Sequence, residues 1–148
     1  MRRIRPIHKL PLMKARFLLL GLLWLALGAC QKDEDPALLP GAWQVLSIKP
    51  SGEGLQIAPR RYTLTFREDG GFSIPLDVNY CGGRYRSPAP GQLELPDGVA
   101  CDEACCDSPF ARELVMILSA VERFDLRGRK LALRGERGEI ALRSRLDE

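Results

Sequence analysis

Histidine is almost missing from this sequence. The single histidine is His8, close to the N-terminus, so the rest of the chain has no imidazole for general acid–base catalysis, nucleophile activation or metal binding. Paired carboxylates are the remaining catalytic option. Asp102, Glu103 and Asp107 are close in sequence, but they fall in a predicted loop, where acids are usually solvated. We therefore predict no catalytic residue and no enzymatic activity.

A long hydrophobic run is also lacking. The apolar run Phe17–Leu27 is too short to cross a bilayer as a helix, which takes about 20 residues. It follows basic residues and ends in small ones, the pattern of a secretory signal peptide. The motif Leu27-Gly28-Ala29-Cys30 resembles a bacterial lipobox, whose cysteine receives a diacylglycerol and becomes the mature N-terminus. We expect a signal peptide over residues 1–29, with translation from Met1 or Met13, and a lipid anchor at Cys30.

Excess positive charge is confined to this leader. Residues 1–29 hold six of the 22 Lys and Arg residues and no acid, which leaves 16 basic against 19 acidic residues and a net charge of −3. No basic patch with interleaved aromatic residues remains, so nucleic acid is excluded as a partner. Residues 30–41 are charged and proline-containing, as expected of a solvated tether. Their lysine followed by acids also resembles the surface-export signal of Bacteroidetes lipoproteins.

The cysteines lack the Cys-x-x-Cys spacing of thioredoxin-like redox sites. Besides Cys30 there are four, Cys81, Cys101, Cys105 and Cys106. A Cys₄ zinc site and free thiols are alternatives, but two Cys-x₂₋₄-Cys arms are missing, and disulfides persist in the oxidising space outside the inner membrane. Neighbouring Cα atoms lie ~3.8 Å apart, below the ~4.4–6.8 Å of most disulfides. We therefore predict Cys81 bonded to Cys105 or Cys106, Cys101 bonded to the other, and no metal or cofactor.

Short strands separated by turns fill most of residues 42–148, the predicted domain. Strands are expected at 42–48, 61–66 and 92–95. Residues 67–71 are expected to form a turn, after which residues 72–80 continue extended, with Pro75 at an edge or bulge. A further turn is expected at Gly82–Gly83. Three more strands are expected after residue 121. Alternating Phe/Leu and Leu/Ile positions mark their buried faces, and the interleaved arginines mark a solvated face.

One helix is expected, beginning after Ser108 as N-cap with Pro109 at its first position. Its apolar stripe comprises Phe110, Leu114, Ile117, Leu118 and Val121. The predicted fold class is α+β, a strand-rich antiparallel sheet or partial barrel with one packed amphipathic helix.

A family resemblance now becomes visible. Residues 43–143 resemble the META domain of HslJ-like envelope lipoproteins. The matching positions are Trp43, Leu64-Thr65-Phe66, Asn79, Gly83, Tyr85, Ala100-Cys101, Asp107, Phe110, Leu114, Leu118, Val121, Phe124, Leu126, Gly128, Leu131 and Leu133. The family cysteine before the asparagine is Val78 here, and Cys81 follows instead, as in a Bacteroidetes-type, lipocalin-like subgroup.

The resemblance implies a compact β-rich domain with one helix and no enzymatic activity. We therefore expect a monomeric, non-enzymatic lipoprotein of the cell envelope, anchored to the outer membrane on its periplasmic or surface side. Its role would be structural, stress-related or in binding another envelope protein. The alternative is a lipocalin-like carrier of a small apolar ligand, with Trp43 in the cavity wall; an apolar interior pocket distinguishes the two.

Overall fold

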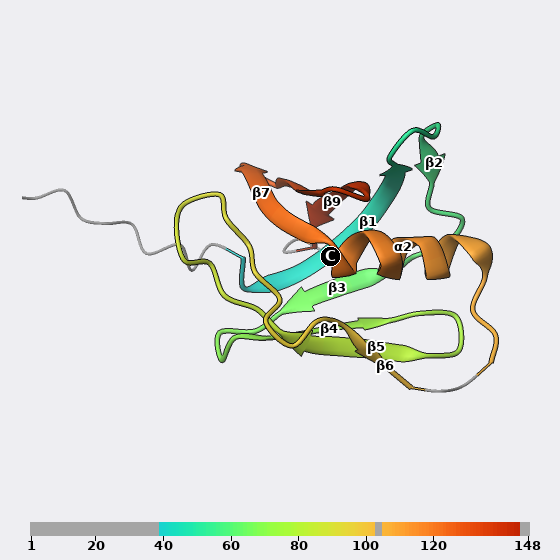
Figure 1. The fold of residues 1–148 in the computed structure, drawn as a ribbon, viewed down its shortest axis with the longest axis horizontal. Helices are drawn as coiled ribbons and strands as arrows, with labels where there is room; N and C mark the ends of the chain where they lie inside the picture. Colours follow the sequence, from blue (N-terminus) through green and yellow to red (C-terminus); the bar gives the residue numbers. More distant parts are fainter. Residues whose placement is uncertain (1–38, 103–104, 146–148) are drawn as a thin grey trace, which may run out of the picture. The chain divides into compact units, whose positions relative to one another are not determined.

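The computed structural model describes residues 39–102 and 105–145, which form one helix and nine strands (Figure 1). The strands are β1 Gly41–Pro50, β2 Gln56–Ile57, β3 Thr63–Phe66, β4 Gly71–Pro75, β5 Tyr80–Arg84, β6 Ala100–Cys101, β7 Val121–Arg127, β8 Lys130–Gly135 and β9 Gly138–Ser144, and the helix is α2 Pro109–Ser119. No helix of these described residues has the length and hydropathy to cross a membrane.

The strands make one antiparallel half-barrel sheet in the order β6-β5-β4-β3-β1-β9-β8-β7, with β2 paired to β1. Consecutive strands are neighbours along most of this path, and the long connection runs from β6 through the helix to β7. The central strand β1 carries a bulge between Val45 and Ser47, where it pairs with β9. Bulges bend a strand, and this one helps to curve the sheet around its core.

The two ends of the sheet are bridged by the segment between β5 and β6. Arg86 and Glu94 exchange backbone hydrogen bonds of 3.0 and 2.9 Å, which folds the segment back beside β5. The Leu93 amide then donates to the Glu122 carbonyl (2.9 Å), and the Phe124 amide donates to the Gly91 carbonyl (2.9 Å), both on the edge of β7. The predicted strand at 92–95 is thus a pair of isolated bridges, and it covers an edge that would otherwise be open.

Helix α2 lies across one face of the sheet, against β9 and β1 (Figure 1). The Ser108 hydroxyl accepts a hydrogen bond from the Ala111 amide (3.2 Å), and Pro109 occupies the first turn, as predicted. Four members of the predicted apolar stripe, Phe110, Leu114, Ile117 and Leu118, are buried against the core. The fifth, Val121, is not part of the helix, because α2 ends at Ser119 and Val121 begins β7. Local sequence signals therefore define this helix correctly.

The space between helix and sheet is filled by side chains. Trp43 is 5% exposed and donates its indole N–H to the Leu39 carbonyl at 2.9 Å. The largest side chains below 2% exposure are Tyr62, Phe66, Phe72, Leu39, Ile48, Leu64, Ile74, Leu93, Leu114, Ile117, Leu118 and Leu131. Trp43 is thus a core residue with its one polar group satisfied.

The region around the glycine pair differs from its prediction. Residues 72–80 form a hairpin, with β4 ending at Pro75 and the chain turning over residues 76–79, whereas Gly82 and Gly83 lie within β5 and make no turn. A Cβ on Gly82 would lie 2.7 Å from the Phe72 carbonyl oxygen, and one on Gly83 would lie 2.6 Å from the Gly98 oxygen. These glycines permit close backbone approach on both sides of a strand.

Candidate functional site

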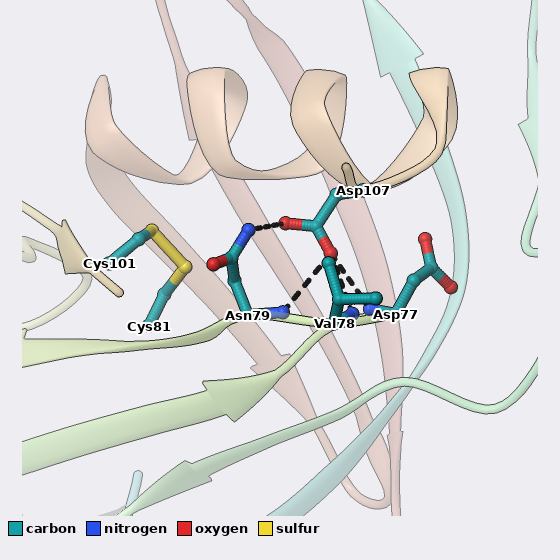
Figure 2. Close-up of a disulfide and its surroundings, with 6 residues drawn as sticks. All are labelled: Asp77, Val78, Asn79, Cys81, Cys101 and Asp107. Atoms are coloured by element: carbon teal, nitrogen blue, oxygen red, sulfur yellow. Dashed lines mark hydrogen bonds between the residues drawn. A yellow bond between two sulfur atoms is a disulfide. The ribbon is translucent and has the colours of Figure 1, made fainter. Parts of the chain in front are cut away.

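The disulfide between Cys81 and Cys101 joins two neighbouring strands (Figure 2). The two residues are directly opposite each other in the β5–β6 register, and their sulfur atoms are 2.01 Å apart. Cys81 is fully buried and Cys101 is exposed, so the bridge joins the core to the surface at the short β6 pairing. The pairing of Cys81 with Cys105 or Cys106 was therefore a wrong prediction.

The physical reason is the strand register, because β6 places Cys101 beside Cys81 before the chain reaches the adjacent cysteines. The structure joins Cys105 to Cys106, the pairing that their spacing had disfavoured. Both of these residues are exposed, just ahead of the helix. The four cysteines therefore form one cross-strand bridge within the sheet, with Cys81 buried and Cys101 exposed, and one exposed pair outside it.

Beside the Cys81–Cys101 bridge, Asp107 binds the turn between β4 and β5 (Figure 2). Its Oδ1 accepts hydrogen bonds from the backbone amides of Asp77 (3.0 Å), Val78 (3.0 Å) and Asn79 (3.3 Å). Its Oδ2 accepts one from the Asn79 side-chain amide at 2.5 Å. One carboxylate thus accepts hydrogen bonds from all three consecutive amides of the turn, so the prediction that Asp107 is solvated was wrong. Of the other two acids, Asp102 is exposed, and Glu103 lies outside the described residues.

A second carboxylate, that of Asp77 in the turn, binds the residues at the start of the helix. Asp77, in the turn, accepts a hydrogen bond through Oδ2 from the Ser108 amide (2.9 Å) and through Oδ1 from the Tyr62 hydroxyl and the Arg60 guanidinium (3.0 Å each). It therefore places negative charge at the N-terminus of α2, where the helix dipole favours it. We call Asp77, Asn79, Asp107 and Ser108 the aspartate clasp.

The hydrogen bonds of the clasp lower the pKa of both carboxyl groups. The Ser108 side-chain hydrogen bond is the main cause for Asp77, whose pKa falls to about 2. Burial works against ionisation of Asp107, but the hydrogen bonds from Asn79 and from the turn amides outweigh it and lower its pKa. Burial, chiefly, raises the pKa of the neighbouring Tyr62. At neutral pH both aspartates are ionised and tyrosine is neutral.

The hydrogen bonds of Asp77 and Asp107 suit a structural role better than a catalytic one. A general acid needs a proton near neutral pH, and a general base needs a free lone pair aimed at substrate. The two aspartates have no proton to give, and each oxygen accepts at least one hydrogen bond from the fold itself. In the described part of the chain, no group of three or more His, Cys, Asp or Glu side chains is placed to hold a metal ion.

Two hollows of the described surface lie outside the packed interior. One of about 290 Å³ lies on the outer face of β7, β8 and β9, above Ala132 and Ala141. A second, of about 370 Å³, lies beside residues 93–96 and the end of the helix. The side chains between helix and sheet occupy the place that a lipocalin-like ligand would take, so the packing lends no support to that alternative.

Comparison with known proteins agrees with this architecture. The sequence model of the META domain family matches residues 36–148. The chain belongs to the META domain family. No curated protein matches it significantly. Sequence reasoning had found Asn79 and Asp107 through this family pattern, whereas it passed over Asp77, whose Asp-x-Asn turn sequence is the available signal.

Two solved structures share the META fold seen here. A DUF4847 family protein from Bacteroides vulgatus is 12% identical with a TM-score of 0.54, and the match covers 74% of this chain and 96% of that one. A protein solved by NMR is 20% identical with a TM-score of 0.55, covering 74% of this chain and 93% of the other. At these identities the likeness shows the fold alone.

Proposed function

We propose that this META domain is a non-enzymatic module of a bacterial cell envelope, tethered by a lipid on Cys30. The observation that carries the proposal is the Leu27-Gly28-Ala29-Cys30 lipobox directly after a signal-like apolar run. These residues lie outside the described part of the structure. The Cys81–Cys101 disulfide supports an oxidising compartment, because such bonds form and persist outside the cytoplasm.

A structural or protein-binding role fits the site better than a chemical one. The carboxylates of the clasp are ionised and engaged by the fold, and the interior is filled. What the domain offers its surroundings is therefore a rigid surface held at the membrane. We place it on the outer membrane, facing either the periplasm or the medium, with a stress-related or scaffolding role.

Metabolic labelling tests the anchor. Cells that express the full chain are grown with an alkyne-bearing fatty acid, and the purified protein is examined for label. We expect label on the wild-type chain and none on Cys30→Ser, with Cys105→Ser as the matched cysteine control that keeps it. An unlabelled wild-type protein, or a labelled Cys30→Ser variant, would exclude the lipid anchor.

Protease treatment of intact cells tests the side of the membrane. A surface-exposed domain is digested before the cells are opened, and a periplasmic domain is digested only afterwards. The lysine and acids after Cys30 favour the surface. Full protection on intact cells, with digestion after lysis, would instead assign the domain to the periplasm.

A further inference from the structure

The outer face of the sheet places two cations directly opposite each other. Lys130 of β8 pairs with Arg143 of β9 in the antiparallel register, and the neighbouring Leu131 and Leu142 are buried. Side chains alternate between the faces of a strand, so Lys130 and Arg143 point to the outside. Like charges at directly opposed positions destabilise a sheet, and an anion bound between them would remove this cost.

The same two cations line a hollow of about 580 Å³ together with Arg129 and Leu46. Leu46 lies at the bulge of β1, which turns its side chain toward the outer face. Apart from Leu46, all the residues that line this hollow are cationic. We call these four residues the cationic hollow.

The acids of this face already have partners. Asp125 pairs with Arg127 (2.9 Å) and Arg134 (3.8 Å), and Glu139 pairs with Arg134 at 2.7 Å. Over residues 39–102 and 105–145, the structure shows no ion pair between a carboxylate and Lys130 or Arg143. The domain beyond the leader is acidic in total, and yet this part of its surface is positive.

Exposed aliphatic side chains lie in and just before strand β2, which pairs with β1. Ile57 is 69% exposed, and Leu55 is 63% exposed. Ile57 pairs with Ser47 of β1, which itself pairs with Ala141 of β9, so this register continues the outer face from β9 to β2. Cations beside exposed aliphatic residues are typical of elements that lie on a membrane surface.

We propose that this outer face docks on an anionic bilayer, with lipid phosphate groups in the cationic hollow and Ile57 and Leu55 at the apolar boundary. A bilayer surface presents a plane of phosphates above an apolar layer, which complements both parts of the face. The inference rests on the proposed lipid anchor for its setting, because the anchor holds the domain within reach of the headgroups.

Residues 35–148 are a compact unit that contains the helix and all the described strands. Vesicle co-flotation with this unit tests the docking without the anchor. Vesicles of neutral phosphatidylcholine are compared with vesicles that contain anionic phosphatidylglycerol. We expect binding to the anionic vesicles only, weakened by salt because the attraction is electrostatic. The double variant Lys130→Gln/Arg143→Gln should lower the partition coefficient about 30-fold, from two lost cations near the surface. The control Arg86→Gln/Arg112→Gln, with the same change of charge elsewhere, should stay near wild type.

The outcomes separate the two proposals. Equal losses in the two double variants would show attraction to net charge alone and would overturn the docking face. Absence of vesicle binding, with salt-sensitive binding of polyglutamate through Lys130 and Arg143, would replace the bilayer with an acidic protein partner. Neither result depends on Cys30, whose lipidation is read by fatty-acid labelling of the full chain.

Discussion

Asp107 is the residue on which the contact between the helix start and the β4–β5 turn depends. Its carboxylate accepts four hydrogen bonds, three of them from consecutive backbone amides. An amide left without an acceptor in a partly buried place costs about 1–3 kcal/mol. The residue therefore has a structural explanation that does not involve chemistry on a substrate.

Replacing Asp107 by alanine should thus destabilise the domain strongly. We expect Asp107→Ala to lower the free energy of unfolding by about 3 kcal/mol, and Asp107→Asn by less, because the amide oxygen still accepts from the turn. Urea unfolding followed by circular dichroism measures both. The exposed Asp102→Ala is the control and should stay within about 0.5 kcal/mol of wild type. Equal effects of Asp102→Ala and Asp107→Ala would refute the clasp.

The pKa of Asp77 predicts a specific dependence of stability on pH. Its folded-state pKa is about 2 and its ordinary value is 3.8, so the folded state binds the proton more weakly than the unfolded state. The stabilisation is therefore complete above about pH 4 and is lost as the pH falls toward 2; it amounts to about 2 kcal/mol at neutral pH. Asp77→Asn should lack this dependence.

Urea titrations between pH 2 and pH 7 test this sign. The difference in unfolding free energy between wild type and Asp77→Asn should be largest at neutral pH and should shrink as the pH approaches 2. Asp102→Asn is a suitable comparison, because Asp102 is exposed and lies outside the clasp. A difference that stays constant over this range would mean that Asp77 does not titrate as its hydrogen bonds require.

Among the elements, the β5–β6 pair depends most on its cross-link. Strand β6 has only two residues, and Cys101 provides one of its two pairings with β5. The disulfide spans 20 positions, and a loop of this size corresponds to about 3 kcal/mol in the chain-entropy account. Cys81→Ala/Cys101→Ala should lower the free energy of unfolding by about this amount, whereas Cys105→Ala/Cys106→Ala should cost less.

Peptide mapping without reductant tests the pairing itself. Cleavage after Glu103 separates Cys101 from Cys105 and Cys106, and trypsin releases Cys81 on another peptide. We expect the Cys81 peptide to be linked to the Cys101 peptide by mass. A link from Cys81 to the peptide with Cys105 and Cys106 would restore the pairing that the sequence predicted.

These elements also show what sequence can predict. The helix and the last three strands have the expected places, because caps, glycines and apolar periodicity act over a few neighbouring residues. The disulfide and the Ser108–Asp77 contact join residues 20 and 31 positions apart, so they depend on strand register and helix docking. Sequence patterns do not specify such long-range contacts. The glycines of β5 were misinterpreted for the same reason, since what they approach is distant in sequence.

At the scale of the whole molecule, the segment between β5 and β6 connects the two ends of the sheet. It is bonded to β7 through the Leu93 and Phe124 amides, while its other side returns to β5. Leu93 itself is 1% exposed and forms part of the common core. These contacts join the β5 end of the sheet to the β7 end. We therefore expect β7 to open only when the whole domain unfolds.

Native-state hydrogen exchange tests this coupling. In the wild type, the Leu93 and Phe124 amides should exchange with the same opening free energy as the Val45 amide of central strand β1, which donates to the Tyr62 carbonyl. Leu93→Ala removes a buried side chain worth about 2–5 kcal/mol, and it should make the Phe124 amide exchange by local opening, well below Val45. Met116→Ala, at an exposed helix position, should leave the two amides matched. If Phe124 exchanges far faster than Val45 already in the wild type, the edge opens independently and the bridging segment does not close the sheet.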